Sequence, residues 1–190
     1  MYRIPRFWRA AALAALTLLP AVLGPGPCRA TIMVAMDVDA LSQAAQVVVV
    51  GRVIGLTSAW DGGRIFTDVT VQKLDVLKGK SPGETLTFSI HGGAVDGIEQ
   101  WVPGEARFKV GEEVGVFVAG LERRAYLVGL AQGKFSVDRA APGGVALVRD
   151  AVPGGLELMA PDGSALSGAV TERPMRIGVE ALRQRLQGGK

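Results

Sequence analysis

Two neighbouring stretches decide the fold: residues 46–56 (QVVVVGRVIGL) and residues 65–77 (IFTDVTVQKLDVL). Both are rich in β-branched residues, which favour strands. Residues 60–64 (WDGGR) lie between them and carry the Asp-Gly signal of a tight hairpin turn. We therefore predict two long strands joined into a β-hairpin.

Breaks in the apolar pattern predict bulges in both strands. Gly51 lies inside the first strand, where a glycine indicates a bulge or a strong bend. In the second strand the residues from Ile65 to Val71 alternate regularly, whereas Leu74 and Val76 are out of phase with them. This change of phase predicts a bulge near Lys73. Bulges of this kind allow a sheet to curve into a barrel.

Further short elements surround this hairpin. A helix is expected at residues 37–45, capped by Asp37 or Asp39, with Val38, Leu41 and Ala45 on one face. The other expected elements are strands at 85–90, 107–108 with 113–119, 125–130 and 134–138, turns at 78–84 and 110–112, and a loop at 92–104. Short strands separated by Gly- and Pro-containing turns are typical of an all-β barrel or sandwich.

After residue 139 the sequence no longer has regularly spaced strand segments. Residues 142–148 (PGGVALV) are echoed by residues 153–159 (PGGLELM), and we expect these two copies to form the strands of a hairpin. Residues 160–174 are expected to be a loop. Residues 178–187 predict an amphipathic helix whose apolar face holds Val179, Leu182 and Leu186. We expect this helix to cap the core, with a membrane or partner helix as the alternative.

The first thirty residues have the pattern of a secretory signal. Three arginines precede an apolar run of roughly 14 residues (AAALAALTLLPAVL), which is followed by GPGP and small residues. The run is shorter than the ~20 residues of a membrane-spanning helix. We therefore expect cleavage between Ala30 and Thr31, a secreted or periplasmic location, and no stable membrane insertion afterwards. Retention as an anchor and lipidation of Cys28 are the alternatives.

Cleavage would change the charge and the thiol content of the chain. The whole chain has 21 basic and 18 acidic residues, and four of the arginines lie in the first thirty residues, which hold no acidic residue. The remainder has 17 basic and 18 acidic residues, so no basic surplus is left for binding nucleic acid. Cys28 is the only cysteine and His91 the only histidine. These numbers exclude a zinc site of the usual ligand count, and no cofactor is expected.

His91 is the obvious catalytic candidate, in SIHGG at residues 89–93. It could act as a general base or belong to a His-Gly-Gly oxyanion loop. Such a hydrolase would need a nucleophile, and the G-x-S-x-G pattern does not occur. We therefore prefer a structural role for His91.

The loop that follows His91 holds candidate recognition residues. The carboxylates of Asp96, Glu99 and Glu105 could bind a hard cation, although the dense Asp/Asn pattern of calcium loops is missing. Trp101 either covers an open barrel end, which we favour, or is an exposed recognition aromatic. The candidate recognition loop is thus defined by His91, Asp96, Glu99 and Trp101.

Four segments carry a family resemblance: residues 45–53 (AQVVVVGRV), 75–79 (DVLKG), 108–118 (FKVGEEVGVFV) and 126–129 (YLVG). Their order resembles a group of uncharacterised secreted bacterial proteins. It is also similar to the netrin-like OB-fold barrel of the tissue inhibitors of metalloproteinases. The resemblance implies a barrel and a protein partner at its rim. Those inhibitors hold the protease zinc through an N-terminal Cys, which is absent from a chain that starts at Thr31, so no site residue carries over.

The expected organisation is a signal peptide at 1–30, a mostly β, OB-like Greek-key barrel at 31–139, and a hairpin, loop and helix at 140–190. The expected function is an exported, non-enzymatic binding module for a secreted protease or another envelope protein. A hydrolase that uses His91 is one alternative. A structural envelope component that docks through the C-terminal helix is the other.

Overall fold

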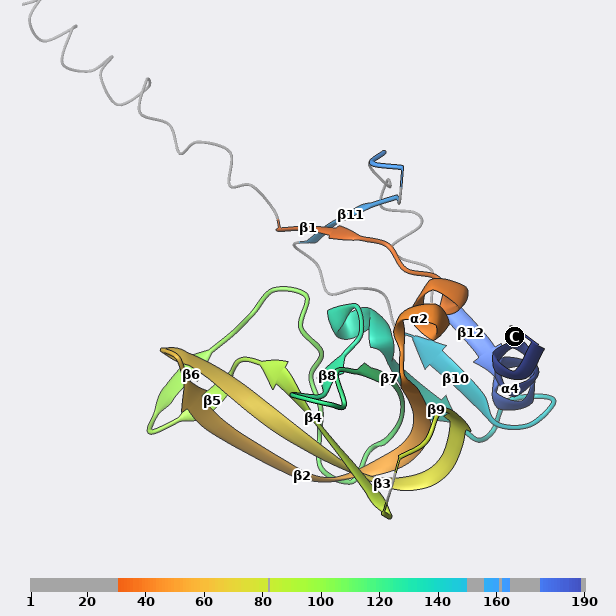
Figure 1. Cartoon of the computed structure of the whole chain (residues 1–190), viewed down its shortest axis with the longest axis horizontal. Coiled ribbons are helices and arrows are strands. Elements are labelled where there is room, and N and C mark those ends of the chain that lie inside the picture. Colours follow the sequence, from red (N-terminus) through yellow and green to blue (C-terminus); the bar gives the residue numbers. More distant parts are fainter. Residues whose placement is uncertain (1–30, 82, 150–155, 161, 165–174, 189–190) are drawn as a thin grey trace, which may run out of the picture. The chain divides into compact units, whose positions relative to one another are not determined.

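The computed structural model describes residues 31–81, 83–149, 156–160, 162–164 and 175–188. Two units are distinguished along the chain, residues 1–30 and residues 31–190, and the second is described here. It is mostly β (Figure 1). None of the helices in the described ranges is long and apolar enough to cross a bilayer. The signal-peptide prediction and the Cys28 alternative lie outside the described residues.

The elements follow one another in this order (Figure 1): β1 (Thr31–Val34), α2 (Val38–Ala44), β2 (Val47–Asp61), β3 (Arg64–Lys78), β4 (Thr85–His91), β5 (Gly93–Val95), β6 (Ile98–Gln100), β7 (Glu113–Ala119), β8 (Tyr126–Leu127), the 3-10 helix η1 (Leu130–Gly133), β9 (Lys134–Asp138), β10 (Ala146–Arg149), β11 (Leu156–Met159), β12 (Met175–Gly178) and α4 (Val179–Gly188).

One large sheet organises the molecule, in the order β12-β10-β9-β7-β2-β3-β4-β8. The short strand β8 pairs in parallel with β4 and antiparallel with β7. The strands β7, β2, β3, β4 and β8 are therefore paired in a closed cycle, in which each strand pairs with the next and β8 pairs with β7. Two small sheets, β1-β11 and β5-β6, complete the structure.

The β2–β3 hairpin confirms the prediction from the deciding stretches. Its strands are joined by Gly62 and Gly63, which have φ values of 57° and 78°, as a two-residue turn of this kind requires. The register shifts next to Gly51, as expected. A Cβ on Gly51 would lie 2.4 Å from the Gln72 carbonyl oxygen, so the close approach of the two strands requires glycine here. Leu74 is the extra residue of the predicted bulge near Lys73.

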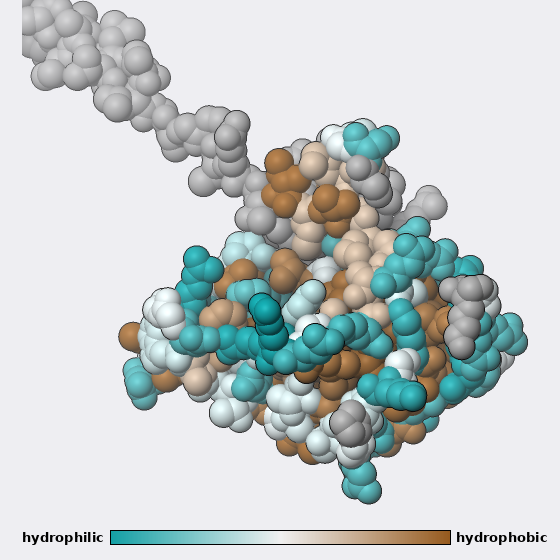
Figure 2. Space-filling view, viewed as in Figure 1, coloured by the Kyte–Doolittle hydropathy of each residue, from teal (hydrophilic) through white to brown (hydrophobic). Residues whose placement is uncertain are grey.

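Two apolar clusters lie on the two sides of the main sheet. Because β2 is buried on both faces at its start, Val47 and Val49 belong to one cluster while Val48 and Val50 belong to the other. The first cluster also takes Phe88 and Phe108, which meet edge to face. On the face in view in Figure 2, polar side chains are mixed with apolar ones, and apolar side chains are exposed over β1.

Both predicted helices are confirmed, and both cover the second cluster. The Asp37 carboxylate caps α2 by accepting from the Ala40 N–H, and Leu41 is fully buried. In α4, Val179 and Leu182 are buried in the cluster and Leu186 packs against it. The apolar face of α4 is therefore occupied by the chain's own core, as expected of a core-capping helix.

The predicted C-terminal hairpin is wrong. β10 pairs with β9 and β12, whereas β11 runs parallel to β1. The residues of the two repeated segments correctly predict strands, but they do not indicate with which strands these pair. Leu147 of β10 is fully buried in the second cluster, so long-range packing selects its neighbours. Strands β1 and β12 were not expected, and most of the loop predicted at 160–174 lies outside the described residues.

The predictions for the middle of the chain need smaller corrections. The expected loop at 92–104 contains the short hairpin β5–β6, closed by Asp96 and Gly97 with positive φ. Residues 107–108 are not in a strand. Of the strand expected at 125–130, only β8 forms, because Gly129 and Leu130 adopt left-handed backbone angles that end it and start η1.

Candidate functional site

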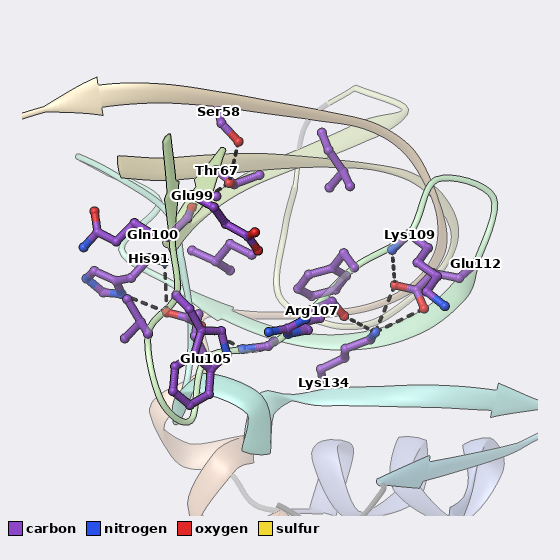
Figure 3. Close-up of a pocket in the computed structure, with 18 of the residues that line it drawn as sticks. Ser58, Thr67, His91, Glu99, Gln100, Glu105, Arg107, Lys109, Glu112 and Lys134 are labelled. Carbon is purple, nitrogen blue, oxygen red and sulfur yellow. Dashed lines mark hydrogen bonds and ion pairs between the residues drawn. The ribbon is translucent and has the colours of Figure 1, made fainter. Parts of the chain in front are cut away.

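An open pocket of about 600 Å³ lies where the β5–β6 hairpin and the following loop meet the main sheet (Figure 3). Its walls come from β2, β3, the end of β4, the β5–β6 hairpin, the loop at 101–112 and β9. Apolar and charged side chains are mixed in the lining. They include Leu56, Trp101, Phe108, His91, Glu99 and Arg107.

The end of β4 places His91 at the pocket edge, against a buried carboxylate. The Glu105 side chain is 6% exposed, and its Oε2 lies 2.9 Å from the backbone N of His91 and 2.8 Å from Nδ1. Oε1 accepts from the Ala106 N–H at 3.1 Å. Because a carboxylate only accepts, the Nδ1 atom carries a proton and Nε2 of the neutral ring is an acceptor. The imidazole is 46% exposed and packs against the Phe66 ring at 5.0 Å.

Two hydroxyls of the pocket, those of Ser58 and Thr67, have hydrogen-bond partners other than His91. Thr67 Oγ1 donates to the Gly92 carbonyl at 2.7 Å and lies 2.8 Å from Ser58 Oγ. Figure 3 shows this pair on a different side of the pocket from His91. No described hydroxyl is hydrogen bonded to the imidazole, so the arrangement lacks the nucleophile–base contact of a hydrolase.

A second charged pair lies at the opposite end of the pocket (Figure 3). Lys134 Nζ contacts the two carboxylate oxygens of Glu112 at 2.9 and 3.1 Å, donates to the Arg107 carbonyl, and sits 4.6 Å from the centre of the Phe108 ring. Glu112 also accepts from the Lys109 N–H at 2.8 Å. These contacts hold this end of the lining in place.

Three charged side chains of the lining have no such partner. Within the described part of the chain, neither Arg107, Lys109 nor Glu99 makes a side-chain hydrogen bond or ion pair, and all three are exposed. Leaving His91 aside, the lining holds three basic and three acidic side chains and has no net charge, but two of its cations, Arg107 and Lys109, are unpaired and available to a ligand.

Three of the four predicted recognition residues meet in this pocket. His91, Glu99 and Trp101 line it, and Trp101 is 54% exposed. Asp96 is exposed at the tip of the β5–β6 hairpin and does not line the pocket. No group of three potential metal ligands occurs among the described residues.

The sequence did not reveal the partners of these residues. The sequence indicates Glu105 only as a possible cation ligand, whereas the structure buries it between Gly104 and Ala106, where a carboxylate needs a hydrogen-bond partner. Lys134 comes from β9, far along the chain, and nothing in the local pattern indicates that it reaches Glu112.

A second pocket, of about 510 Å³, lies between β3, the turn at 143–145 and the start of α4. Its charged side chains are engaged, since Arg139 pairs with Glu113 and Asp75 pairs with Arg183. The pocket at the β5–β6 hairpin, with its exposed aromatic and unpaired charges, is therefore the better candidate for ligand binding.

No known family model, curated protein or solved structure matches this chain.

Proposed function

We propose that the protein is an exported, non-enzymatic binding module that holds a protein partner in the pocket beside the β5–β6 hairpin. One observation carries the proposal. The pocket exposes Trp101 in a lining whose buried polar groups are already satisfied by the chain itself. Such a lining keeps its shape without a ligand, and exposed tryptophans are common anchors of protein interfaces.

An OB-like barrel is the architecture proposed for this module. The support is the closed set of pairings among β7, β2, β3, β4 and β8, since the OB-fold is a five-stranded Greek-key barrel. The netrin-like resemblance of the sequence agrees with this proposal. Folds of this type hold many kinds of ligand, so the proposed partner follows from the pocket and not from the fold.

Export is proposed from the first thirty residues. Their basic and apolar segments have the order of a signal peptide, and cleavage after Ala30 would leave a chain that starts at Thr31.

The test is capture of partners from the exported fraction by three forms of the protein. Trp101→Ala removes the exposed anchor of the pocket. Leu121→Ala removes an exposed apolar side chain that does not line it and is the matched control. We expect a protein that is retained by the wild type and by Leu121→Ala and lost with Trp101→Ala. If no protein shows this dependence on Trp101 at several salt concentrations, the proposal fails.

The second candidate is a hydrolase that uses His91 as a general base. The observation that favours it is the buried carboxylate of Glu105 at Nδ1, which orients the imidazole and leaves Nε2 available. Activity on a panel of ester, amide and phosphate substrates would then disappear in His91→Ala and remain in Trp101→Ala. Equal activity of wild type and His91→Ala, or no turnover at all, would exclude this candidate.

A further inference from the structure

The second half of β2 has an edge that no described strand covers. β7 pairs with β2 only from Val47 to Arg52, and two more hydrogen bonds join Val53 to Gly111 and Glu112. Beyond Val53, β2 pairs with β3 alone as far as Asp61. Figure 1 shows this part of the hairpin extending past β7.

The register identifies the backbone groups on that edge. Asp61 faces Arg64 across the two-residue turn, so alternate residues of β2 direct their N–H and C=O groups to β3. Ile65, the partner of Trp60, uses its own N–H for Gln100 and its C=O for Gly92, on the side away from β2. The N–H and C=O groups of Leu56, Ser58 and Trp60 therefore point away from β3, and they have no backbone partner among the described residues.

This edge also lacks the usual protection against added strands. Residues 55–60 (GLTSAW) contain no charged residue and no proline, and their register with β3 is regular beyond the bulge at Ile54. Ile54, Leu56 and Trp60 are 47%, 38% and 46% exposed. The β5–β6 hairpin does not cover the edge, because Gly93 of β5 lies against the side chains of Ser58 and Thr67, on the face of the sheet.

The pocket lies directly beside the open edge. Leu56 and Ser58 belong to its lining, and the facing wall carries Arg107 and Lys109, whose side chains have no partner in the described structure. An extended chain that hydrogen bonds to β2 would thus enter the pocket, with alternate side chains directed towards Trp101 and the two cations. The two unpaired cations on this wall favour acidic side chains at the positions opposite them.

We infer that the partner of this protein is an extended, acidic peptide segment that adds as a strand to the edge of β2 at residues 56–60. This inference rests on the proposed binding function and names the kind of partner. The added strand obtains affinity from the main-chain groups of Leu56, Ser58 and Trp60, and specificity from the pocket.

The probe is a labelled linear peptide selected on the purified protein from a displayed library of random sequences. Amide hydrogen exchange is measured by NMR with and without this peptide. Binding should slow exchange at Leu56, Ser58 and Trp60 by at least about tenfold. The amides of Thr57 and Ala59, which are already bonded to β3, should be protected in both states and serve as internal controls.

Two variants of one residue test the backbone contact separately. Leu56→Pro removes one edge N–H and leaves the bonds to β3 in place, while Leu56→Val changes the side chain and keeps that N–H. We expect Leu56→Pro to weaken peptide binding about tenfold and Leu56→Val to change it much less. Should Leu56→Pro not fold, N-methylation of alternate peptide residues makes the same test on the wild-type protein. Neutralising Arg107 and Lys109 by Gln should weaken binding and lower its salt dependence.

The outcomes separate this inference from the proposed function. A Trp101-dependent partner whose binding leaves the exchange of the three edge amides unchanged would overturn the added strand and keep the binding module. Protection of the same amides without peptide, in a form shown by light scattering to be a dimer, would also overturn it, because a second copy would be the occupant. If neither a peptide nor a Trp101-dependent protein is found, both proposals fail.

Discussion

Glu105 shows at the scale of a single residue how the pocket is held in shape. Its two oxygens serve the backbone N–H groups of His91 and Ala106 and the Nδ1 atom of the imidazole. Glu105→Ala leaves these donors without an acceptor and should lower the free energy of unfolding by about 2 kcal/mol. Glu99→Ala, an exposed position without such bonds, should change it by less than about 0.5 kcal/mol. Urea unfolding measures both, and equal effects would contradict this role.

The ion pairs of Glu113 make the stability of the protein depend on pH. A hydrogen bond from the Arg52 side chain, with help from Arg139, holds the pKa of Glu113 below its usual value. A folded-state pKa below the unfolded one means that the stabilisation is complete above about pH 4.3 and is lost as the pH falls through the folded-state value. The stability difference between wild type and Glu113→Gln should therefore shrink from neutral pH to about pH 3. Because the Arg52 side chain is half exposed, the coupling in an Arg52–Glu113 double-mutant cycle should stay below about 1 kcal/mol.

At the scale of elements, the bulge at Gly51 bends the β2–β3 hairpin. A Cβ there would meet the Gln72 carbonyl oxygen and a Val71 methyl group, both at 2.4 Å, whereas a Cβ on Gly55 would meet nothing closer than 3.8 Å. Gly51→Ala should destabilise the protein by about 2 kcal/mol or more, and Gly55→Ala by less than about 1 kcal/mol. Thermal unfolding of the two variants provides the comparison. Similar melting temperatures would show that the strands can separate at Gly51 at little cost.

The helix α4 belongs to the core. Leu182 is fully buried in the second cluster, so Leu182→Ala should lower the free energy of unfolding by about 2–4 kcal/mol. Gln187→Ala changes an exposed position of the same helix and should have little effect. If Leu182→Ala is neutral, α4 does not cap the core in solution, and its apolar face becomes available to a neighbour in the envelope.

At the scale of the whole molecule, the proposed export makes a prediction about the N-terminus. Intact mass and N-terminal sequence of the protein from cell fractions should show a start at Thr31 in a soluble fraction. A start at an acylated Cys28, or an uncut chain in the membrane fraction, would contradict the proposed cleavage. That result would direct the search for partners to the membrane.

Local signals predicted the elements better than their partners. Val47–Val53 and Ile65–Val71 predict strands because β-branched residues alternate there, and the WDGGR turn joins them. The repeated PGG segments equally predict strands, but pairing between distant strands depends on which faces can be buried together. In the folded chain β10 therefore pairs with β9 and β12, and β11 pairs with β1.

For the candidate site, too, the sequence predicts local features but not the contacts between distant residues. The sequence by itself determined the β hairpin, its bulge beside Gly51, the capped helix α2 and the closeness of His91, Glu99 and Trp101 along the chain, because each follows from residues close together in the sequence. Only the tertiary structure brought Glu105 to His91, Lys134 to Glu112, and the unpaired edge of β2 to Arg107 and Lys109. These contacts join residues far apart in the sequence, so they depend on how the packing of the whole sheet places β2, β4, β9 and the loop after β6.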